Sequence, residues 1–406
     1  MRLLVVMKTY PFPPRTGSQI VAYNYIKHLS KKHLISLVCL QKFKRKRNKN
    51  HKVAPAEFVE HLELLPIKML SPTIKWARSL LFYILKGDSP LVSAHYSRQM
   101  KDKVRALIEN GDFDAILSFE LSTIQYCPPS CFDKLIVNIE DPQSIKLNRM
   151  RELPIWSLWQ KTKLTVNAKL TERYEQKFLH RLAKVILLSE SDMRDMCSVK
   201  KFRNLTYMPY GVELKNASES IDYKKREKTI IFSGNMYHPP NVDGALYFLK
   251  DIFPLVLKEH PLAVLWIVGS NPDSRIHKEA AKYGKQVVIT GTVEDITVYI
   301  KNATVSICPV RLKIGVQTKL LEALSLGTPV VTTSAGNSGI GGESGVHLWV
   351  EDEPHKFAFR VVSLLNGYNW EKLSNEGKKL VSERFTWETN VAEFEQYLES
   401  LVISNK

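Results

Sequence analysis

The 406-residue chain carries 58 Lys and Arg residues against 41 Asp and Glu residues, with 44% hydrophobic and 24% charged residues. This composition is too apolar for a disordered chain and too evenly mixed for a fibrous or repeat protein. A globular protein of about two to three domains is therefore expected. No stretch approaches the roughly 18 apolar residues of a membrane span, and the apolar run before Lys8 is short for a signal peptide. These features predict a cytoplasmic protein.

Positive charge is concentrated in the first half of the chain. Residues 1–215 hold 37 basic and 19 acidic residues, a net charge of +18, whereas residues 216–406 hold 21 and 22, a net charge of −1. Seven Lys and Arg residues lie within residues 42–52, KFKRKRNKNHK. Such a run is either a solvated loop or a contact for an anionic partner. No helix-turn-helix or RNA-binding signature accompanies it, so nucleic acid is not the expected partner.

A second segment of the first half suggests contact with a membrane surface. Residues 73–87, TIKWARSLLFYILKG, combine apolar residues around most of a helix with basic residues at one end. This pattern is typical of a buried helix or of a helix that lies in the membrane interface. Together with the basic run, it suggests that the protein binds peripherally at the inner face of the membrane. Neutralising Lys44 to Lys49 would then release it from anionic liposomes at low salt.

Several common site types find little support. The five cysteines are few, odd in number and scattered, which fits neither a disulfide framework nor a paired zinc ribbon. No GxxxxGK[ST] motif is present. The nearest match to a dinucleotide fingerprint, residues 339–345, places Ser344 where the third glycine belongs and does not join a strand to a helix. Nicotinamide-linked chemistry and P-loop hydrolysis are therefore disfavoured.

Strand and helix patterns alternate along the chain, twice over. Short apolar runs predict strands at residues 2–8, 34–40, 113–119, 134–140 and 183–189, and again at 229–235, 262–270, 286–293, 304–310 and 328–334. Helical patterns lie between them, and the turn at 208–214 followed by the lysine-rich residues 221–228 resembles a linker. Alternation of this kind indicates an α/β protein with doubly wound parallel sheets.

The repetition of this pattern predicts two Rossmann-like domains that face each other across a cleft. The first spans residues 1–215 and the second spans 216–385. The terminal segment, 386–406, is expected to form a helix that packs back on the first domain.

Glycines at the predicted strand ends of the second half suggest a phosphate site. Ligands of open parallel sheets lie beyond the carboxyl ends of the strands, near helix N-termini. Any single glycine turn is an ordinary chain reversal, but four in one domain favour a bound phosphate. These turns are Ser233-Gly234-Asn235, Gly269-Ser270, Thr290-Gly291 and Thr333-Ser334-Ala335-Gly336.

Residues 308–331, CPVRLKIGVQTKLLEALSLGTPVV, are the most informative stretch. Arg311, Lys313 and Lys319 lie just before and within a predicted helix, where cations add to the helix dipole in binding a diphosphate. Glu322 follows Lys319 at i+3 on the same helix face. Its carboxylate either binds ribose hydroxyls or forms an ordinary surface ion pair.

This stretch resembles the donor-site signature of the GT-B-fold, family-4-type retaining glycosyltransferases, in particular a capsule and exopolysaccharide subset. Residues 322–331, EALSLGTPVV, match the EA(M/L)xxGxPVV pattern. The resemblance extends over most of the chain through Tyr10-Pro11-Phe12-Pro13-Pro14 with Gly17, Tyr174-Glu175, Ser189-Glu190-Ser191-Asp192 and Tyr210-Gly211-Val212-Glu213. It implies that Glu322 binds the donor ribose. It also implies that Gly17 and the cations near the helix hold the nucleoside diphosphate.

The chain departs from the family pattern at two donor-site positions. Ile314 stands where the family often has a second Glu, eight residues before Glu322. Residues 234–241 take a G-x-M…PN form in place of the usual phosphate-binding Gly-Arg-Leu…Lys. The subset with this form has a Lys/Gln-rich helix start, which Gln317, Lys319 and Arg311 would provide here.

Candidate catalytic residues follow the strand at 134–140. Relatives carry His-Asp or Asp-rich residues there, whereas this chain has Asn138, Glu140 and Asp141. Glu140 and Asp141 would orient the acceptor hydroxyl or take its proton; alternatively they form a polar turn before Pro142. Asp112-Phe113-Asp114 is a DxD sequence, but it directly precedes a strand, so we interpret it as a turn and expect no metal.

The resemblance predicts a glycosyltransferase of the hexosyltransferase type that needs no cofactor or metal. It would move a sugar from a nucleotide-diphosphate sugar, bound by residues 216–385, to an acceptor glycan, glycolipid or other hydroxyl, bound by residues 1–215. Configuration would be retained. The alternatives are a sugar-nucleotide epimerase on the same scaffold and an inactive GT-B-like binding protein. The expected donor-binding residues are Glu322, Lys319, Arg311, Gln317, Thr318, Gly17, Gly234, Asn235 and Gly291, and the expected catalytic residues are Glu140, Asp141 and Asn138.

Overall fold

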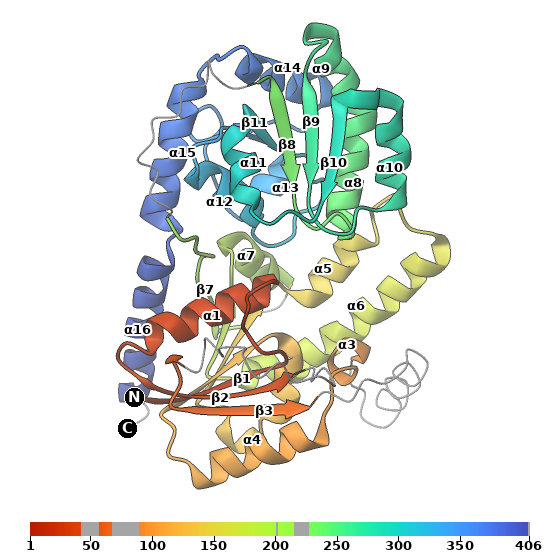
Figure 1. Ribbon diagram of the computed structural model, residues 1–406. Helices are drawn as coiled ribbons and strands as arrows, with labels where there is room; N and C mark the ends of the chain where they lie inside the picture. The colour runs from red at the N-terminus through yellow and green to blue at the C-terminus, as the bar shows by residue number, and fades with distance from the viewer. Residues whose placement is uncertain (42–56, 67–88, 200–201, 215–226, 405–406) are drawn as a thin grey trace. The chain divides into compact units, whose positions relative to one another are not determined.

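The computed structural model describes residues 1–41, 57–66, 89–199, 202–214 and 227–404 (Figure 1). The basic run 42–52, the expected helix 73–87 and most of the expected linker 221–228 lie outside the described residues. The chain divides into two compact units. The first comprises Met1–Asn148, Trp159–Gly211 and Trp387–Lys406, and the second comprises Arg149–Leu158 and Val212–Thr386. Residues 149–158, assigned from the sequence to the first domain, thus group with the second unit.

The first unit is built around a seven-stranded parallel sheet of order β3-β2-β1-β4-β5-β6-β7. Apolar runs form its strands, and all five residues of β4 are buried. The strands are β1 (Arg2–Met7), β2 (Leu34–Gln41), β3 (His61–Pro66), β4 (Ala115–Phe119), β5 (Leu135–Glu140), β6 (Lys184–Leu187) and β7 (Leu205–Tyr207). The helices are α1 (Gly17–Leu29), α3 (Pro90–Ser93), α4 (Arg98–Asn110), α5 (Gln143–Met150), α6 (Leu158–Phe178), α7 (Glu190–Val199) and α16 (Trp387–Ser404).

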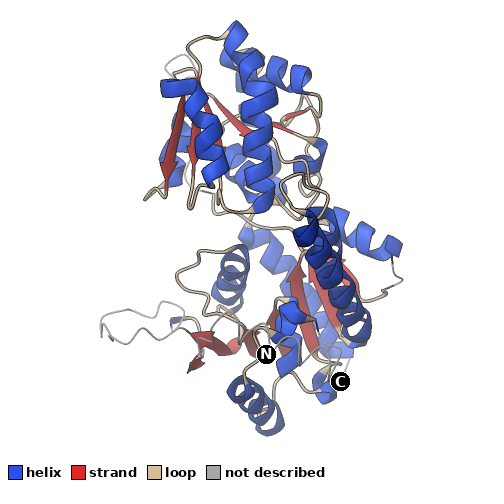
Figure 2. Cartoon of the chain, turned by 90° about the vertical axis from the view of Figure 1, so that its right-hand side faces the viewer, coloured by secondary structure: helices blue, strands red, loops and turns tan. Residues whose placement is uncertain are grey.

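The second unit repeats this plan with a six-stranded parallel sheet of order β10-β9-β8-β11-β12-β13. The strands are β8 (Thr229–Ser233), β9 (Val264–Val268), β10 (Val287–Gly291), β11 (Val305–Cys308), β12 (Val330–Thr332) and β13 (Trp349–Val350). The helices are α8 (Pro239–Tyr247), α9 (Phe253–Glu259), α10 (Ser274–Ala280), α11 (Ile296–Asn302), α12 (Thr318–Ser325), α13 (Ser334–Asn337), α14 (Pro354–Leu365) and α15 (Trp370–Arg384), with a π-helical segment at Phe248–Ile252. Figure 2 shows helices on either side of the strands in both units.

Each sheet has its own apolar core. In the first unit the core includes Leu4, Val6, Ile116 and Val137 from neighbouring strands. In the second, Trp370 is fully buried and its indole N–H donates to the Thr304 carbonyl at 2.7 Å. Helices from distant parts of the sequence complete these cores. The terminal helix α16 packs on α1 within the first unit, where the rings of Phe394 and Tyr25 lie 5.1 Å apart.

The strand order fixes where a ligand would bind in each unit. In both sheets the order reverses beside the first strand, between β1 and β4 and between β8 and β11. Doubly wound sheets bind ligands at this switch point, outside the carboxyl ends of the strands. The residues that follow β1, β4, β8 and β11 are therefore the first places to look for function.

Helix α1 begins beside the first of these switch points and has a complete N-terminal cap. The Thr16 hydroxyl accepts a hydrogen bond from the Gln19 N–H, and the Gln19 side chain accepts one from the Thr16 N–H. We expect Thr16→Ala to lower the free energy of unfolding by about 1 kcal/mol, because it leaves a helix N–H without its partner. Chemical denaturation measures this change. Thr16→Ser keeps the hydroxyl and should be close to neutral; an equal loss in both variants would contradict the capping explanation.

Candidate active site

The switch point of the second unit is shaped by two glycines. Gly234, directly after β8, has φ of 140°, and Gly269, directly after β9, has φ of 149°. A Cβ atom on Gly269 would lie 1.7 Å from the Gly234 carbonyl oxygen, so the two turns can pack together only if residue 269 has no side chain. Beside them, the hydroxyl of buried Ser233 has no hydrogen-bond partner among the described residues. The two turns therefore leave room for a ligand at this edge of the sheet, and the Ser233 hydroxyl is available to hydrogen-bond it.

A buried ammonium lies at this switch point. Lys319, in the first turn of α12, is only 9% exposed. Its Nζ donates to Asn241 Oδ1 at 2.8 Å and to Gln317 Oε1 at 3.1 Å, and it lies 5.4 Å from the centre of the Phe232 ring. A Cβ on Gly234 would be 3.3 Å from its Cε, which places Lys319 beside the glycine turn.

The described surroundings of Lys319 leave its charge without a counter-ion. Its partners in that part of the chain are amide oxygens and a ring, and none is a carboxylate. Buried charges are normally paired. An ammonium in this state is suited to binding an anion that enters from outside.

Helix α12 adds its own N-terminus to the same place. Its N-cap residue, Gln317, makes no side-chain cap, so the first N–H groups of the helix are not satisfied in that way. The Gln317 amide instead donates to the Ile314 carbonyl at 3.0 Å. Half-buried Thr318 opens the helix, and half-buried Glu322 follows one turn after Lys319. The helix begins after Gln317 and ends before Gly327, as the sequence predicted.

Arg311 has a side-chain partner that its position in the sequence does not reveal. Its guanidinium forms a two-point ion pair with Asp243, at 3.0 Å from Nε to Oδ2 and 2.6 Å from Nη2 to Oδ1, and stacks over the Tyr247 ring. The Asp243 side chain is almost fully buried, and its hydrogen bonds raise the pKa of Arg311. The cation therefore neutralises a buried carboxylate and lines a cavity of about 350 Å³ with Tyr247 and Arg275.

The remaining positions of the expected donor site are also placed. The Asn235 side chain accepts from the Tyr237 N–H at 3.0 Å, and the Asn235 carbonyl accepts from Asn241. Gly291 ends β10, and its carbonyl accepts from the Gly269 N–H. Ile314, which replaces the family's second Glu, is buried in a small apolar cluster with Leu153 and Leu312, where a carboxylate would be desolvated.

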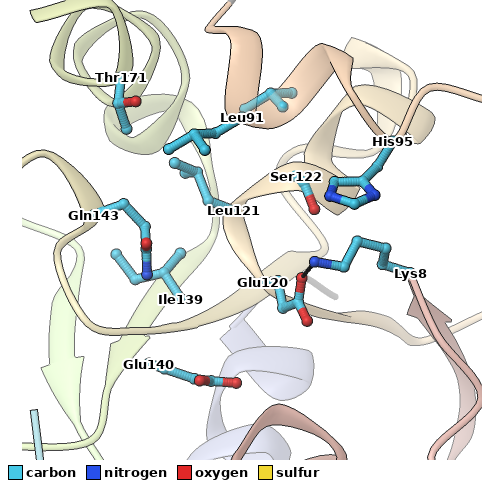
Figure 3. Close-up of a pocket in the computed structure, with 11 residues that line it drawn as sticks. Lys8, Leu91, His95, Glu120, Leu121, Ser122, Ile139, Glu140, Gln143 and Thr171 are labelled. Carbon is cyan, nitrogen blue, oxygen red and sulfur yellow. Dashed lines mark ion pairs between the residues drawn. The ribbon is translucent and has the colours of Figure 1, made fainter. Parts of the chain in front are cut away.

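In the first unit, two glutamates follow or end neighbouring strands at the switch point. Glu120 follows β4 and Glu140 ends β5, with φ of 75° and 61° respectively, a left-handed conformation that is rare outside glycine. Strained backbone of this kind is concentrated at functional sites. Glu120 forms an ion pair with Lys8, directly after β1 (Figure 3).

These side chains line a cavity of about 250 Å³. Figure 3 shows Lys8, Glu120, Glu140 and Ser122 around it, with apolar Leu91, Leu121 and Ile139 as further lining. Two buried polar atoms of this lining, Glu140 Oε1 and Ser122 Oγ, have no hydrogen-bond partner among the described residues. Asn138 Nδ2, two residues before Glu140, has none there either. Buried polar groups are rarely left unpaired, so the cavity is prepared for a polar ligand or water.

The environment of Glu140 changes its acidity. The pKa of Glu140 is raised to about 8. Burial is the largest cause, the charges of Asp141 and Glu120 add to it, and those of Lys146 and Lys8 oppose it. A carboxyl group with this pKa exchanges its proton near neutral pH, which suits general acid–base work. Gly17 is a neighbour, since a Cβ there would lie 3.8 Å from Glu140 Oε2.

The other two expected catalytic residues hold this arrangement in place. Asn138 Oδ1 accepts from the Glu140 N–H at 3.0 Å, which fixes the turn. Asp141 pairs with Lys146 at 2.6 Å. The Asp114 side chain accepts from the Arg2 N–H at 2.8 Å, a backbone contact at the opposite end of β1 from Lys8.

Sequence reasoning missed Lys8, Glu120 and Asn241. The available signal was the position of Lys8 and Glu120 directly after predicted strands, because residues after adjacent parallel strands meet at one edge. That rule was applied to the glycines of the second half and, in the first half, only to the strand at 134–140.

Residues 227–367 match the family described as "Glycosyl transferases group 1". Residues 227–367 form a glycosyltransferase group 1 domain. This domain contains the glycine turns, Lys319 and Glu322. A protein described as "Uncharacterized 44.6 kDa protein in cps region" of Klebsiella pneumoniae is 25% identical, over 38% of this chain and 45% of that protein. The chain therefore aligns with less than half of that relative's length.

Solved structures share the fold over almost the whole chain. Sucrose-phosphate synthase from Thermosynechococcus elongatus has a TM-score of 0.72 at 15% identity, covering 100% of both chains. Anabaena Alr3699/HepE in complex with UDP and glucose has a TM-score of 0.65 at 13% identity, covering 98% of this chain and 99% of that one. A mutant of S. aureus TarM in complex with fondaparinux, alpha-GlcNAc-glycerol and UDP has a TM-score of 0.67 at 11% identity, covering 98% and 100%.

These likenesses confirm the fold class expected from the sequence. The group 1 domain and its partner unit are two parallel-sheet, Rossmann-like domains of the GT-B type. In the described part of the chain, no helix combines the length and the apolar character needed to span a bilayer.

Proposed function

We propose that the protein transfers a sugar from a nucleotide-diphosphate sugar to an acceptor hydroxyl with retention of configuration. The observation that carries the proposal is the buried Lys319 ammonium, which meets only neutral partners among the described residues beside the Gly234 turn of a group 1 domain. A diphosphate is the anion whose charge this position would match, with α12 adding its N-terminal amides. The structures of HepE and TarM, solved with UDP, support a uridine diphosphate as the first candidate.

The acceptor hydroxyl would bind in the cavity of the first unit beside Glu140. In the transfer, the bond from the anomeric carbon to the diphosphate oxygen breaks, and a bond to the acceptor oxygen forms on the face that the diphosphate leaves, which retains the configuration. The acceptor proton passes to the Glu140 carboxylate, and the nucleoside diphosphate leaves on Lys319 and the helix amides. This division of roles needs no metal. Asp141 and Asn138 would act by positioning Glu140.

A nucleotide-sugar panel tests this function. In the presence of EDTA, we expect one donor to release nucleoside diphosphate faster when a glycan or glycolipid acceptor is added, and the product to keep the donor's anomeric configuration. An isomerised sugar nucleotide without transfer would instead indicate an epimerase. Binding without turnover across the panel would indicate an inactive GT-B-like protein, and a requirement for metal would contradict the role given to Lys319.

Glu322 is proposed to bind the donor ribose through its carboxylate. We expect Glu322→Ala to weaken nucleoside-diphosphate binding by about 1–3 kcal/mol, the scale of a hydrogen bond to a charged group. Isothermal titration calorimetry with UDP and GDP measures the change. Glu371→Ala, at an exposed position of α15, is the matched control; unchanged affinity in Glu322→Ala would remove this residue from the site.

A further inference from the structure

The long helix α6 runs from Leu158 to Phe178 (Figure 1). Its exposed side chains have an unusual composition. Its buried side chains all lie between Ala168 and Glu175, so the first ten residues, 158–167, bury none completely. Helices in proteins gain most of their stability by packing an apolar face. In the first half of α6 this packing is only partial, because Lys161, Leu164, Thr165 and Asn167 are half-buried and the other residues are exposed.

Large apolar side chains of this helix remain in water. Leu158 is 85% exposed, Trp159 71% and Val166 51%. Exposed apolar side chains mark a contact site when several lie together with polar residues around them. Trp159 and Val166 are seven residues apart and therefore lie on one face of the helix.

The charges on the exposed surface of α6 all have the same sign. Its exposed residues within the first unit include four cations and no Asp or Glu; they are Trp159, Gln160, Thr162, Lys163, Val166, Lys169, Arg173, Gln176 and Lys177. We call this set the α6 surface. Of the two acidic residues in the helix, Glu175 is buried against Ser144 and Glu172 is half-buried.

Cations and apolar groups are arranged together. Lys163 Nζ lies 5.4 Å from the centre of the Trp159 ring, one helical turn away. Trp159, Lys163, Val166, Arg173 and Lys177 follow the three- and four-residue spacing of a single helix face. The cations would contact the anionic headgroups of a membrane surface, and the indole ring of Trp159 would lie at the boundary between the headgroups and the acyl chains.

We propose that the α6 surface binds an anionic phospholipid bilayer, with Trp159 entering the headgroup region. The proposal is independent of the transfer reaction. It concerns residues other than the basic run 42–52.

Vesicle partitioning of the full chain tests the proposal. Each cation near an anionic membrane contributes about 1 kcal/mol, so losing two should weaken partitioning about 25-fold. We expect this change for Lys163→Gln with Arg173→Gln on vesicles of phosphatidylcholine with 30 mol% phosphatidylglycerol. Trp159→Ala should weaken partitioning further, and quenching by brominated lipids should fall in Trp159→Phe.

The control variant removes the same charge elsewhere on the first unit. Lys31→Gln with Arg105→Gln changes two exposed cations outside α6 and should keep partitioning within about twofold of the unchanged protein. A third variant neutralises Lys44 to Lys49 and measures how much the basic run 42–52 contributes to vesicle partitioning. Calorimetric affinity for UDP and transfer to a soluble acceptor should be unchanged in the α6 variants, so a failed donor site and a failed membrane surface give different results.

Several outcomes would overturn the proposal. These are equal binding to vesicles of phosphatidylcholine alone, an equal loss in the control variant, or full retention of the α6 variants while neutralising residues 44–49 abolishes binding. Loss of binding to duplex DNA with unchanged binding to the anionic vesicles would assign the surface to nucleic acid instead.

Discussion

Replacing Glu140 with Gln is expected to lower the turnover of glycosyl transfer by about 10²–10⁴-fold, the range for a lost general base. The side chain is isosteric and the cavity keeps its shape, whereas the amide cannot take the acceptor proton. Calorimetric affinity for the nucleoside diphosphate should change little, because Lys319 and Glu322 lie in the other unit. Steady-state kinetics with varied acceptor separates turnover from binding.

The pH dependence of the reaction rate tests the role of Glu140 as the base more directly. Because the pKa of Glu140 is about 8, its base form is a minority at pH 7, and kcat/KM for the acceptor should rise with pH through a midpoint near 8. Glu120→Gln should move this midpoint down, since it removes a neighbouring negative charge and frees Lys8. Lys8→Met should move it up, because it removes a positive charge.

Protonation of Glu140 also makes the free energy of unfolding depend on pH. The folded protein holds the Glu140 proton up to about pH 8, whereas an unfolded glutamate releases it near 4.3. Between these values the folded state binds more protons, so this residue's contribution to the unfolding free energy falls as pH rises. Glu140→Gln should remove that contribution. A rate profile that keeps its midpoint near 8 in Glu140→Gln would assign the titration to another group.

The sequence predicted the sheets well because their strands are buried on both faces. All ten expected strands are present, since continuous apolar runs between helical patterns leave few alternatives. β3 was missed: its residues are only partly buried at the sheet edge, and His61 and Glu63 interrupt the apolar run. The short strands β7 and β13 offered too few residues for a pattern.

The candidate sites were predicted in part, for a physical reason. Lys319 and Glu322 share one helix, so local spacing sufficed to place them together. The Lys8–Glu120 pair and the Lys319–Asn241 contact join residues 112 and 78 positions apart in the sequence, which periodicity does not reveal. For Arg311, local spacing suggested a role but did not reveal its partner. Its position suggested a phosphate ligand, but Asp243, buried 68 residues earlier, was not visible as its partner.

Two cations of the group 1 domain should therefore respond in opposite ways to the same substitution. Lys319→Met removes a buried charge that only amide oxygens and a ring contact among the described residues, so folding stability should be unchanged or slightly higher. Its affinity for UDP should fall about 10- to 150-fold, which corresponds to about 1.5–3 kcal/mol for a charge-assisted contact.

Arg311→Met instead leaves the Asp243 carboxylate buried without its ion-pair partner. We expect a loss of about 3–5 kcal/mol in the free energy of unfolding and, in the folded fraction, a smaller change in UDP affinity than for Lys319→Met. Denaturation and calorimetry on both variants measure the two quantities separately. Asp243→Asn with Arg311→Met should recover part of the lost stability, because the unpaired charge is gone. If Arg311→Met lost affinity without stability, Arg311 would bind the phosphate and the Asp243 pair would be incidental. If Lys319→Met kept its affinity, the diphosphate would have to bind elsewhere.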